Sequence, residues 1–416
     1  MRNHVLRLLF YVAVGSPATA AAQALSDLAR QNKTVTGESA GAADARPGAR
    51  PRLQTPAQQA AQSLNPDISV IGELLTDLSN GTPRFTTEGD RFEVREVEVG
   101  IQAAVDPFFR ADFFIGFHPD GAEIEEAYVT ALSLPGGLQA KLGQFRVPIN
   151  KVNLIHRPEL ITVDYPLMIR DFFGEEGLAS PGVSLSRIFA PFGFFQEIIV
   201  YGIGRLTGHE HEHEEEVLEF IEAVDRDRLR NQVAFGGQLR NFYDVTPATN
   251  LELGFSAVTG RVREFDPDCE VIDPCPPIIP TEVFENQSFY GAYFTVRWRP
   301  PQRALYRSFI WNNEFLINSG HHGSRAGAFS QAQYQLTRRT FLGARFDAVE
   351  LADELLLDDD SEWLTALSGY LTVFPSEFSR FKLGLERTFG GSEFGDQWRS
   401  VLQTTFAIGP HRPHAF

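Results

Sequence analysis

The sequence predicts an all-β fold, a transmembrane antiparallel β-barrel of about 16 strands with a long constriction loop folded into the lumen. Three observations support this prediction. Short runs that alternate between apolar and polar residues follow one another from Pro66 to the end of the chain. Tight turns and longer polar loops alternate between these runs, as they do in transmembrane barrels. Charged residues fall on the face opposite to the apolar residues.

The composition suits a protein that crosses a membrane with strands. No stretch beyond the first residues holds ~18 consecutive apolar residues, the length that a transmembrane helix needs. The chain has 35 Phe but only 2 Met and 2 Cys, and abundant Phe suits surfaces that face lipid. The formal net charge of -17 argues against nucleic acid as a partner, which requires basic patches. It also argues against a pore built mainly for anions.

The N-terminal region reads as an export signal followed by a leader. Residues 1–22 are predicted to be a signal peptide, because Arg2 and Arg7 precede a short apolar core and a run of small residues. A buried first helix is the alternative. Residues 23–65 are rich in Ala, Gln, Pro and Gly and are predicted to form a disordered periplasmic leader. A small plug is the alternative, and residues 66–416 form the predicted barrel.

The alternating runs place the strands. The predicted strands are 67–79, 91–105, 107–117, 122–134, 138–147, 182–190, 194–206, 229–243, 250–261, 287–299, 304–318, 325–336, 340–350, 361–374, 379–389 and 397–409. Most are long enough to cross a bilayer, which takes ~9–11 tilted residues. The predicted long loops on the extracellular side are 80–90, 147–182, 207–228, 262–286, 319–324, 351–360 and 390–396.

The same alternation assigns a face to each charged side chain. A charge on the lipid face costs about 2–4 kcal/mol at the midplane, so charged residues within strands are expected to face the lumen. The charges assigned to the lumen, as part of the predicted pore lining, are Glu96, Glu98, Arg110, Asp112, Arg345 and Asp347.

The end of the chain also follows this pattern. In the run 397–409, Trp398 and Phe406 share one face, whereas Arg399 and Gln403 lie on the other. This run resembles the closing strand of a bacterial outer-membrane barrel, and the terminal Phe416 is the predicted assembly signal. A soluble strand followed by Phe by chance is the alternative.

The longest predicted loop, residues 147–182, is too apolar for a loop in solvent. Tyr165, Phe172 and Phe173, among others, require burial. A loop folded into the barrel would bury them and narrow the pore, as constriction loops do in porins. Its candidate pore-lining residues are Lys151, His156, Arg157, Glu159, Asp164, Arg170, Asp171, Glu175 and Glu176. The alternative is that these charges only attach the loop to the barrel wall.

Specific motifs in and around this loop carry a family resemblance. They are LGQFRVPINKVN, the His-Arg-Pro and VDYPL elements, FFGEEGLASPGVSLS and the closing GPHRPHAF. In these motifs the chain resembles the phosphate-selective porin O and P family, and within it the zinc-regulated outer-membrane receptor group. The resemblance implies a porin-like barrel that passes solutes. Phosphate pores need clustered Lys or Arg at the constriction, whereas this loop carries both signs of charge.

Histidines gather in predicted extracellular loops. His209, His211 and His213 alternate with glutamates, and imidazole with carboxylate suits Zn²⁺. His321 and His322 fall in another loop on the same side. These five histidines are candidate metal ligands for Zn²⁺, although no cofactor is predicted to be required. The alternative is a solvated acidic loop that binds metal only incidentally.

The remaining chemistry is sparse. Cys269 and Cys275 lie close together in one predicted loop of an exported chain, which favours a local disulfide. The motifs typical of serine hydrolases, zinc proteases and P-loop nucleotide-binding proteins are absent. We therefore predict that the protein is not an enzyme.

Together these observations predict a porin-like channel for passive diffusion of small solutes or ions, leaning to cations, in the outer membrane of a Gram-negative bacterium. The alternative is a divalent-metal (zinc) binding and uptake protein that uses the His-rich loop. The predicted partners are outer-membrane lipid and lipopolysaccharide, the barrel-assembly machinery, small solutes or metal ions, and further copies of the chain in a homotrimer.

Overall fold

The computed structural model describes residues 66–79, 90–119, 121–206, 233–266, 281–320, 323–351, 363–390 and 397–409. Several predictions fall outside these ranges and stay predictions. They concern the signal peptide 1–22, the leader 23–65, and His209, His211, His213, His321, His322, Cys269, Cys275 and Phe416.

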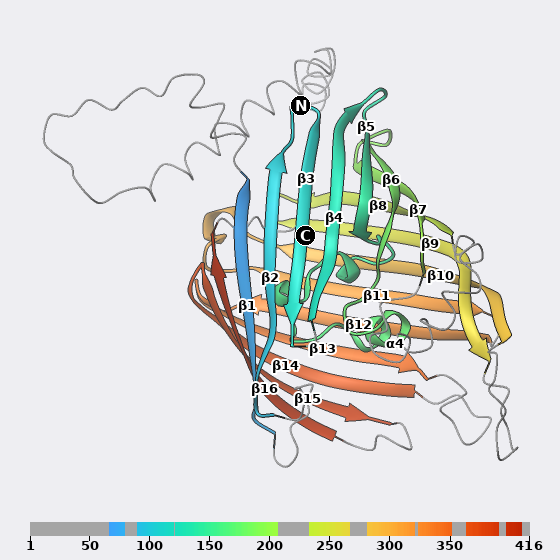
Figure 1. Ribbon diagram of the computed structural model, residues 1–416. Helices are drawn as coiled ribbons and strands as arrows, with labels where there is room; N and C mark the ends of the chain where they lie inside the picture. Colours follow the sequence, from blue (N-terminus) through green and yellow to red (C-terminus); the bar gives the residue numbers. More distant parts are fainter. Residues whose placement is uncertain are drawn as a thin grey trace, which may run out of the picture. The chain divides into compact units, whose positions relative to one another are not determined.

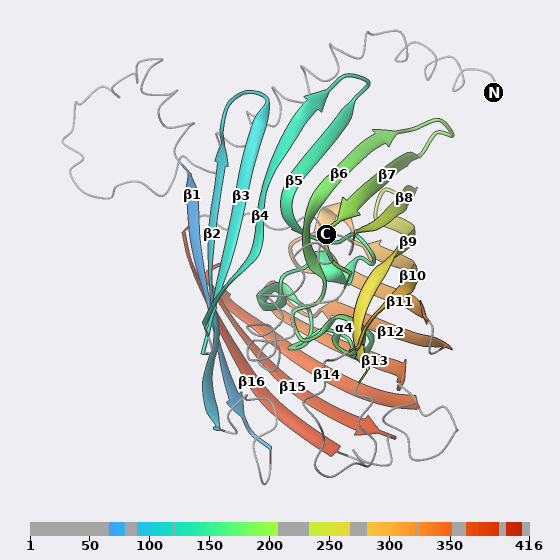
Figure 2. The ribbon, with the colours of Figure 1, turned by 45° about the vertical axis from the view of Figure 1, so that its right-hand side comes forward.

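The described residues form 16 strands in a closed antiparallel barrel (Figures 1 and 2). The strands are β1 (Asp67–Asp77), β2 (Phe92–Ala104), β3 (Phe109–His118), β4 (Gly121–Leu134), β5 (Leu138–Arg146), β6 (Ala179–Phe189), β7 (Phe195–Ile203), β8 (Ala234–Thr246), β9 (Thr249–Asp266), β10 (Thr281–Trp298), β11 (Phe309–Gly320), β12 (Gly323–Gln335), β13 (Thr340–Glu350), β14 (Trp363–Ser376), β15 (Ser379–Phe389) and β16 (Gln397–Ile408). Each strand pairs with the next, so the predicted fold class is confirmed.

The last strand closes the barrel against the first. β16 pairs with β1 from Val70–Ile408 to Asp77–Val401. Its apolar face points outward, where Phe406 is 47% exposed, whereas Gln403 on the other face is fully buried. An apolar outer face is what hydrocarbon accepts, and closure leaves no strand edge unpaired in lipid. The predicted faces of this strand are therefore confirmed.

The helical segments among the described residues are short. They are η1 (Val152–Leu154), η2 (Arg157–Glu159), α4 (Leu167–Phe173) and η4 (Pro301–Arg303). Within the described part of the chain, no helix has the length and apolar character needed to span a membrane.

Two of the predicted long loops are wrong in extent. The prediction of a loop over 319–324 fails because β11 and β12 stay paired as far as Gly320–Gly323. Similarly, β9 and β10 remain paired as far as Asp266–Thr281, well inside the predicted loop 262–286. A strand end that does not face lipid need not alternate between apolar and polar residues, so that its sequence can look like a loop.

Two β-bulges shift the alternation next to the barrel's first strands. Between β1 and β2, Glu73 pairs with Glu96 and Leu74 with Val94, which leaves Arg95 as the extra residue. Between β3 and β4, Phe114 pairs with Glu126 and Ile115 with Ile124, which leaves Glu125 as the extra residue. A bulge turns two consecutive side chains to one face. Arg95 with Glu96, and Glu125 with Glu126, therefore all point inward.

One sector of the inner wall is apolar, contrary to the expectation of polar residues at lumen-facing positions. From β9 to β13, buried apolar side chains line the lumen: Val258, Phe289, Leu316, Phe329 and Val349. They form one hydrophobic cluster with the loop between β5 and β6. The apolar residues of that loop therefore pack against an apolar part of the wall.

Candidate functional site: the loop inside the barrel

The connection between β5 and β6, residues 147–178, lies in the space that the strands enclose (Figures 1 and 2). We call it the inner loop. Its base is fastened by Asn153, whose amide donates to the carbonyls of Val147 and Leu178, both at 2.9 Å. The Asn153 Oδ1 in turn accepts from the Leu178 N–H at 2.8 Å. One buried amide thus joins the two ends of the loop.

The apolar half of the inner loop packs on the apolar sector of the wall. Tyr165, Met168 and Ile169 are fully buried, and burial of such a side chain stabilises by about 1.5–3 kcal/mol. The ring of Phe173 lies 4.7 Å from that of Phe289, between centroids. Gly327 on β12 allows the close approach of α4, because an added Cβ would overlap the Met168 side chain.

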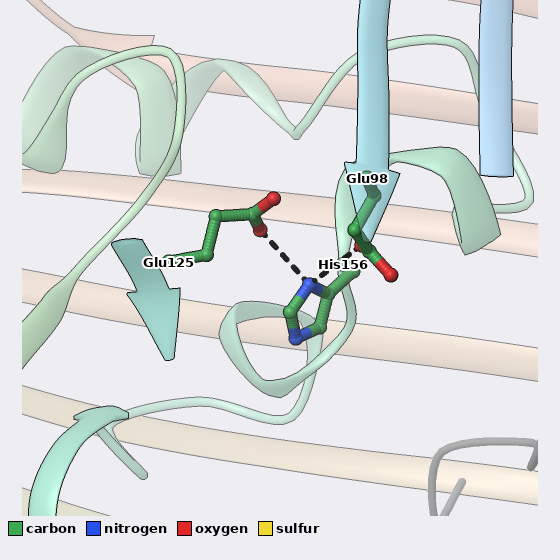
Figure 3. Close-up of side chains that lie close together, drawn as sticks. All are labelled: Glu98, Glu125 and His156. Carbon is green, nitrogen blue, oxygen red and sulfur yellow. Dashed lines mark ion pairs between the residues drawn. The ribbon is translucent and has the colours of Figure 1, made fainter. Parts of the chain in front are cut away.

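The wall facing the first half of the loop is acidic. Glu96 and Glu98 come from β2, and Glu125 and Glu126 from β4; we call this the acidic side. The ring of His156 lies among these carboxylates, with Nδ1 at 3.0 Å from Glu98 Oε2 and 2.9 Å from Glu125 Oε2 (Figure 3). Burial lowers the pKa of His156, but the charges of Glu98 and Glu125 outweigh it, so that the pKa is raised well above its usual value.

Two arginines complete the acidic side. Arg157 on the loop donates to Glu96 Oε2 at 2.9 Å and also pairs with Glu176. Arg146, at the end of β5, donates to Glu125 Oε2 at 2.8 Å. All of these side chains except Glu176 are almost fully buried. A buried charge needs a partner of opposite sign, so these pairs fix the loop at this wall.

A second part of the wall, separated from β2 by β1 and β16, holds the loop with cations. Arg345 on β13 and Lys382 on β15 form what we call the basic side. Arg345 pairs with Asp347 at 2.6 Å and donates to the Asp164 carbonyl at 2.7 Å. Lys382 donates to the carbonyls of Leu160 and Thr162 at 2.8 and 2.5 Å. Here the wall binds the backbone of the loop.

Asp164 links the loop back to the first strands. Its carboxylate lies 2.5 Å from Arg95 of β2, the extra residue of the first bulge, and Arg95 lies 3.6 Å from Glu73. Burial raises the pKa of the Asp164 carboxyl, but the Arg95 guanidinium outweighs this and lowers the pKa below its usual value. Asp164 is therefore ionised and paired at neutral pH.

A third attachment lies on β9 to β11. Lys151 pairs with Glu252 at 2.5 Å and lies 3.3 Å from Thr295. The pKa of Lys151 is lowered by burial, against the charge of Glu252. The N–H of Val152 donates to Glu314 at 3.0 Å. The inner loop is thus attached to the wall on three sides of the lumen.

The structure places most of the predicted loop charges in ion pairs. Beyond those already described, Arg170 pairs with Glu175 at 2.5 Å, and Asp171 pairs with Arg325 of β12 at 3.0 Å. Glu159 lies on η2. On β3, Arg110 and Asp112 pair with each other at 2.5 Å, and the Arg110 side chain keeps 33% of its exposure. Of these pairs, Asp171–Arg325 attaches the loop to the wall, whereas Arg170–Glu175 lies within the loop and Arg110–Asp112 within β3.

Several residues of this site were not predicted from the sequence: Arg95, Glu125, Glu126, Glu252, Glu314 and Lys382. Glu125 and Glu126 carried a signal, because two consecutive glutamates inside a strand break the alternation and point to a bulge. Lys382 stood at a lumen-facing position, but its partners are backbone carbonyls, which leave no mark in the sequence.

The closed barrel, its apolar outer face and its inner loop define a bacterial outer-membrane β-barrel, and this chain resides in the bacterial outer membrane. Solved outer-membrane proteins share the fold. OprB of Pseudomonas putida has a TM-score of 0.54 and 9% identity, over 85% of this chain and 96% of that one.

Two further solved structures are similar. OmpT of Vibrio cholerae, in a form lacking loop L8, has a TM-score of 0.52 and 8% identity, over 82% of this chain and 99% of that one. OmpF of Salmonella typhi, in complex with daunomycin, has a TM-score of 0.51 and 7% identity, over 84% of this chain and 99% of that one. At these identities the likeness shows the fold alone.

By sequence, the chain is similar to a protein of Aquifex aeolicus (strain VF5) that is described as uncharacterized. The two are 27% identical over 349 residues, which cover 78% of this chain and 70% of that protein. No protein-family model matches the chain. These comparisons assign no solute.

Proposed function

We propose that the protein is a porin-like channel for passive diffusion of small solutes or ions, in which the inner loop sets the size and charge of what passes. The observation that carries this proposal is the attachment of the loop across the lumen of a closed barrel, at β2 and β4, at β9 to β11, and at β13 and β15. Solutes must then pass between the loop and the wall, where charged groups decide which of them enter.

We also propose a preference for cations. On the acidic side the four carboxylates outnumber the cations that pair with them, Arg146, His156 and Arg157. On the basic side Arg345 pairs with Asp347, and Lys382 donates its hydrogen bonds to loop carbonyls. The formal net charge of -17 acts in the same direction, because a field of one sign raises the local concentration of ions of the other sign.

Planar-bilayer recording tests both proposals. The purified protein is expected to give discrete conductance steps in KCl, and a salt gradient across the bilayer is expected to give a reversal potential of the sign that marks cation preference. A reversal potential of the opposite sign would exclude the cation preference. The absence of conductance steps would contradict the channel itself.

The finer grouping and assembly remain proposals. The motifs that resemble the phosphate-selective porin O and P family and the zinc-regulated receptor group lie mostly in the inner loop and the strands beside it, which supports the grouping. OmpT of Vibrio cholerae is described in a trimer form, which supports a homotrimer for this chain. Light scattering of the protein in detergent, with the detergent mass subtracted, tests this: a monomer mass would exclude the trimer.

Divalent-metal uptake through His209, His211 and His213 remains a prediction, since these residues lie outside the described ranges. Replacing all three with Ala tests it. A conductance that ignores micromolar Zn²⁺ both before and after the change would exclude metal uptake through this loop.

A further inference from the structure

The ring of His156 has two different environments. Its Nε2 lies 3.1 Å from Glu126 Oε2, and Glu126 also accepts the N–H of Arg146 at 2.7 Å. If a cation displaces the proton on Nδ1, the remaining ring proton lies on Nε2, where Glu126 accepts it. The lone pair of the other nitrogen, Nδ1, then points away from Glu126. The same carboxylate–imidazole arrangement orients histidines that bind metals through their second nitrogen.

Nδ1 faces two carboxylates, as Figure 3 shows. Glu98 Oε2 and Glu125 Oε2 lie 3.0 and 2.9 Å from it. An N–H at Nδ1 can donate a well-aligned hydrogen bond to one of these carboxylates but not to both. Glu98 is only 1% exposed, and within the described part of the chain neither of its oxygens accepts a hydrogen bond. A buried carboxylate in this state is unfavourable unless a cation lies beside it.

Without a metal ion, the one charge of a protonated His156 is shared between Glu98 and Glu125, and the neighbouring arginines have other partners. Arg157 pairs with Glu96, and Arg146 pairs with Glu125. An ion at Nδ1 takes the place of the Nδ1 proton and leaves His156 neutral, so that Glu98, Glu125 and Glu126 then carry three negative charges against one positive charge on Arg146. The difference is two negative charges, which a divalent cation would cancel.

The available ligand atoms suit a transition metal. Nδ1 of His156 and one oxygen each of Glu98 and Glu125 lie within 4.8 Å of one another. One imidazole nitrogen with two carboxylate oxygens is a ligand set for Zn²⁺, Mn²⁺ or Fe²⁺, whereas Ca²⁺ and Mg²⁺ favour oxygen ligands alone. At metal–ligand distances of about 2.0–2.2 Å, the 2.9–3.0 Å separations from Nδ1 must widen slightly.

We propose that His156, Glu98 and Glu125 form a binding site for a divalent transition-metal ion inside the barrel. The ion joins the inner loop to β2 and β4, because each ligand comes from a different one of these three segments. Glu126 orients the imidazole from the other side. The ion therefore fastens the loop to the acidic side, and the proposed ligands do not include His209, His211, His213, His321 or His322.

The test measures bound metal directly and does not depend on channel activity. The full chain is prepared with His209, His211, His213, His321 and His322 all replaced by Ala, stripped with chelator, and dialysed against Zn²⁺ or Mn²⁺. Elemental analysis is expected to find one tightly held ion per chain. Finding none would overturn the proposal, even if the protein conducts ions normally.

Variants in the same background locate the ion. Glu98→Gln and Glu125→Gln are each expected to lose the ion, and Glu126→Gln to bind it about 10–100-fold more weakly. Glu252→Gln is the matched control, because it removes a buried loop-attaching carboxylate on the far wall and should keep the ion. Retention in both Glu98→Gln and Glu125→Gln, or equal loss in Glu252→Gln, would overturn the proposal.

A second measurement covers variants that fail to fold. X-ray absorption at the zinc edge of the unaltered site is expected to show one imidazole among oxygen ligands. A coordination shell with several imidazoles, or with sulfur, would place the ion elsewhere and contradict the site.

Discussion

The acidic side and the basic side hold the same loop by different means. On the acidic side, side chains of the loop meet side chains of the wall, as His156 does with Glu98 and Glu125, and Arg157 with Glu96. On the basic side, Arg345 and Lys382 reach carbonyls of the loop backbone. The first kind of contact depends on which residues the loop carries, whereas the second depends on the path of its backbone.

This difference separates two consequences of mutation. On the basic side the wall residues should matter greatly and most loop side chains little, because the carbonyl acceptors survive substitution. On the acidic side both partners should matter. The following variants test the contrast on the basic side.

The largest effect is expected for Arg345→Met. It leaves Asp347 as a fully buried charge and frees the Asp164 carbonyl, and breaking a buried ion pair costs about 3–5 kcal/mol. Urea unfolding in lipid vesicles measures the loss. The comparison is Arg399→Met, whose guanidinium is 23% exposed and lies 3.9 Å from Glu386, so that a smaller loss than for Arg345→Met is expected. Equal losses in the two variants would contradict the assignment.

A smaller effect is expected for Lys382→Met. The change keeps most of the buried side chain but removes the donors to Leu160 and Thr162, and hydrogen bonds from a charged group contribute about 1.5–3 kcal/mol. The freed backbone should also increase current noise in single-channel recordings. Lys141→Met serves as control, because Lys141 lies over the ring of Tyr128 and, among the described residues, no hydrogen bond joins it to a carbonyl of the inner loop. If the current noise of Lys141→Met equals that of Lys382→Met, Lys382 does not restrain the loop.

The smallest effect is expected for Thr162→Val, a change in the loop itself. It removes the hydroxyl that accepts from Arg345 at 2.6 Å but leaves the Thr162 carbonyl bound to Lys382. A smaller loss than for Lys382→Met is expected in the same urea titration, because the same Arg345 nitrogen still donates to the Asp164 carbonyl. A loss as large as that of Arg345→Met would mean that the loop side chain, and not its backbone, is what the basic side recognises.

The sequence predicted the barrel well because lipid on one face forces apolar residues at alternate positions. Phe346 and Arg345 show this: the first is half exposed and faces outward, and the second is buried in the lumen. The apolar residues of the inner loop also indicated that the loop is buried. Both signals come from the cost of placing polar or apolar groups in the wrong solvent.

Some residues of the site could not be predicted from the sequence, because their positions do not follow from the alternation of apolar and polar residues. Arg95 and Glu125 are the extra residues of bulges, so strict alternation gives them the wrong face. Whether His156 lies in an open pore or among carboxylates depends on the path of the loop, which no periodicity describes. The five apolar wall residues from Val258 to Val349 sit at positions expected to be polar, because the loop, and not water, covers them.

The central claim is that the inner loop crosses the lumen and limits a channel. Replacing residues 155–172 with a short Gly-Ser linker, while Asn153 still joins Val147 and Leu178, removes the loop from the lumen. The single-channel conductance of this variant in KCl is predicted to rise about twofold or more over that of the unaltered chain, because the path widens. An unchanged conductance in a folded variant, or no conductance in either protein, would contradict the account.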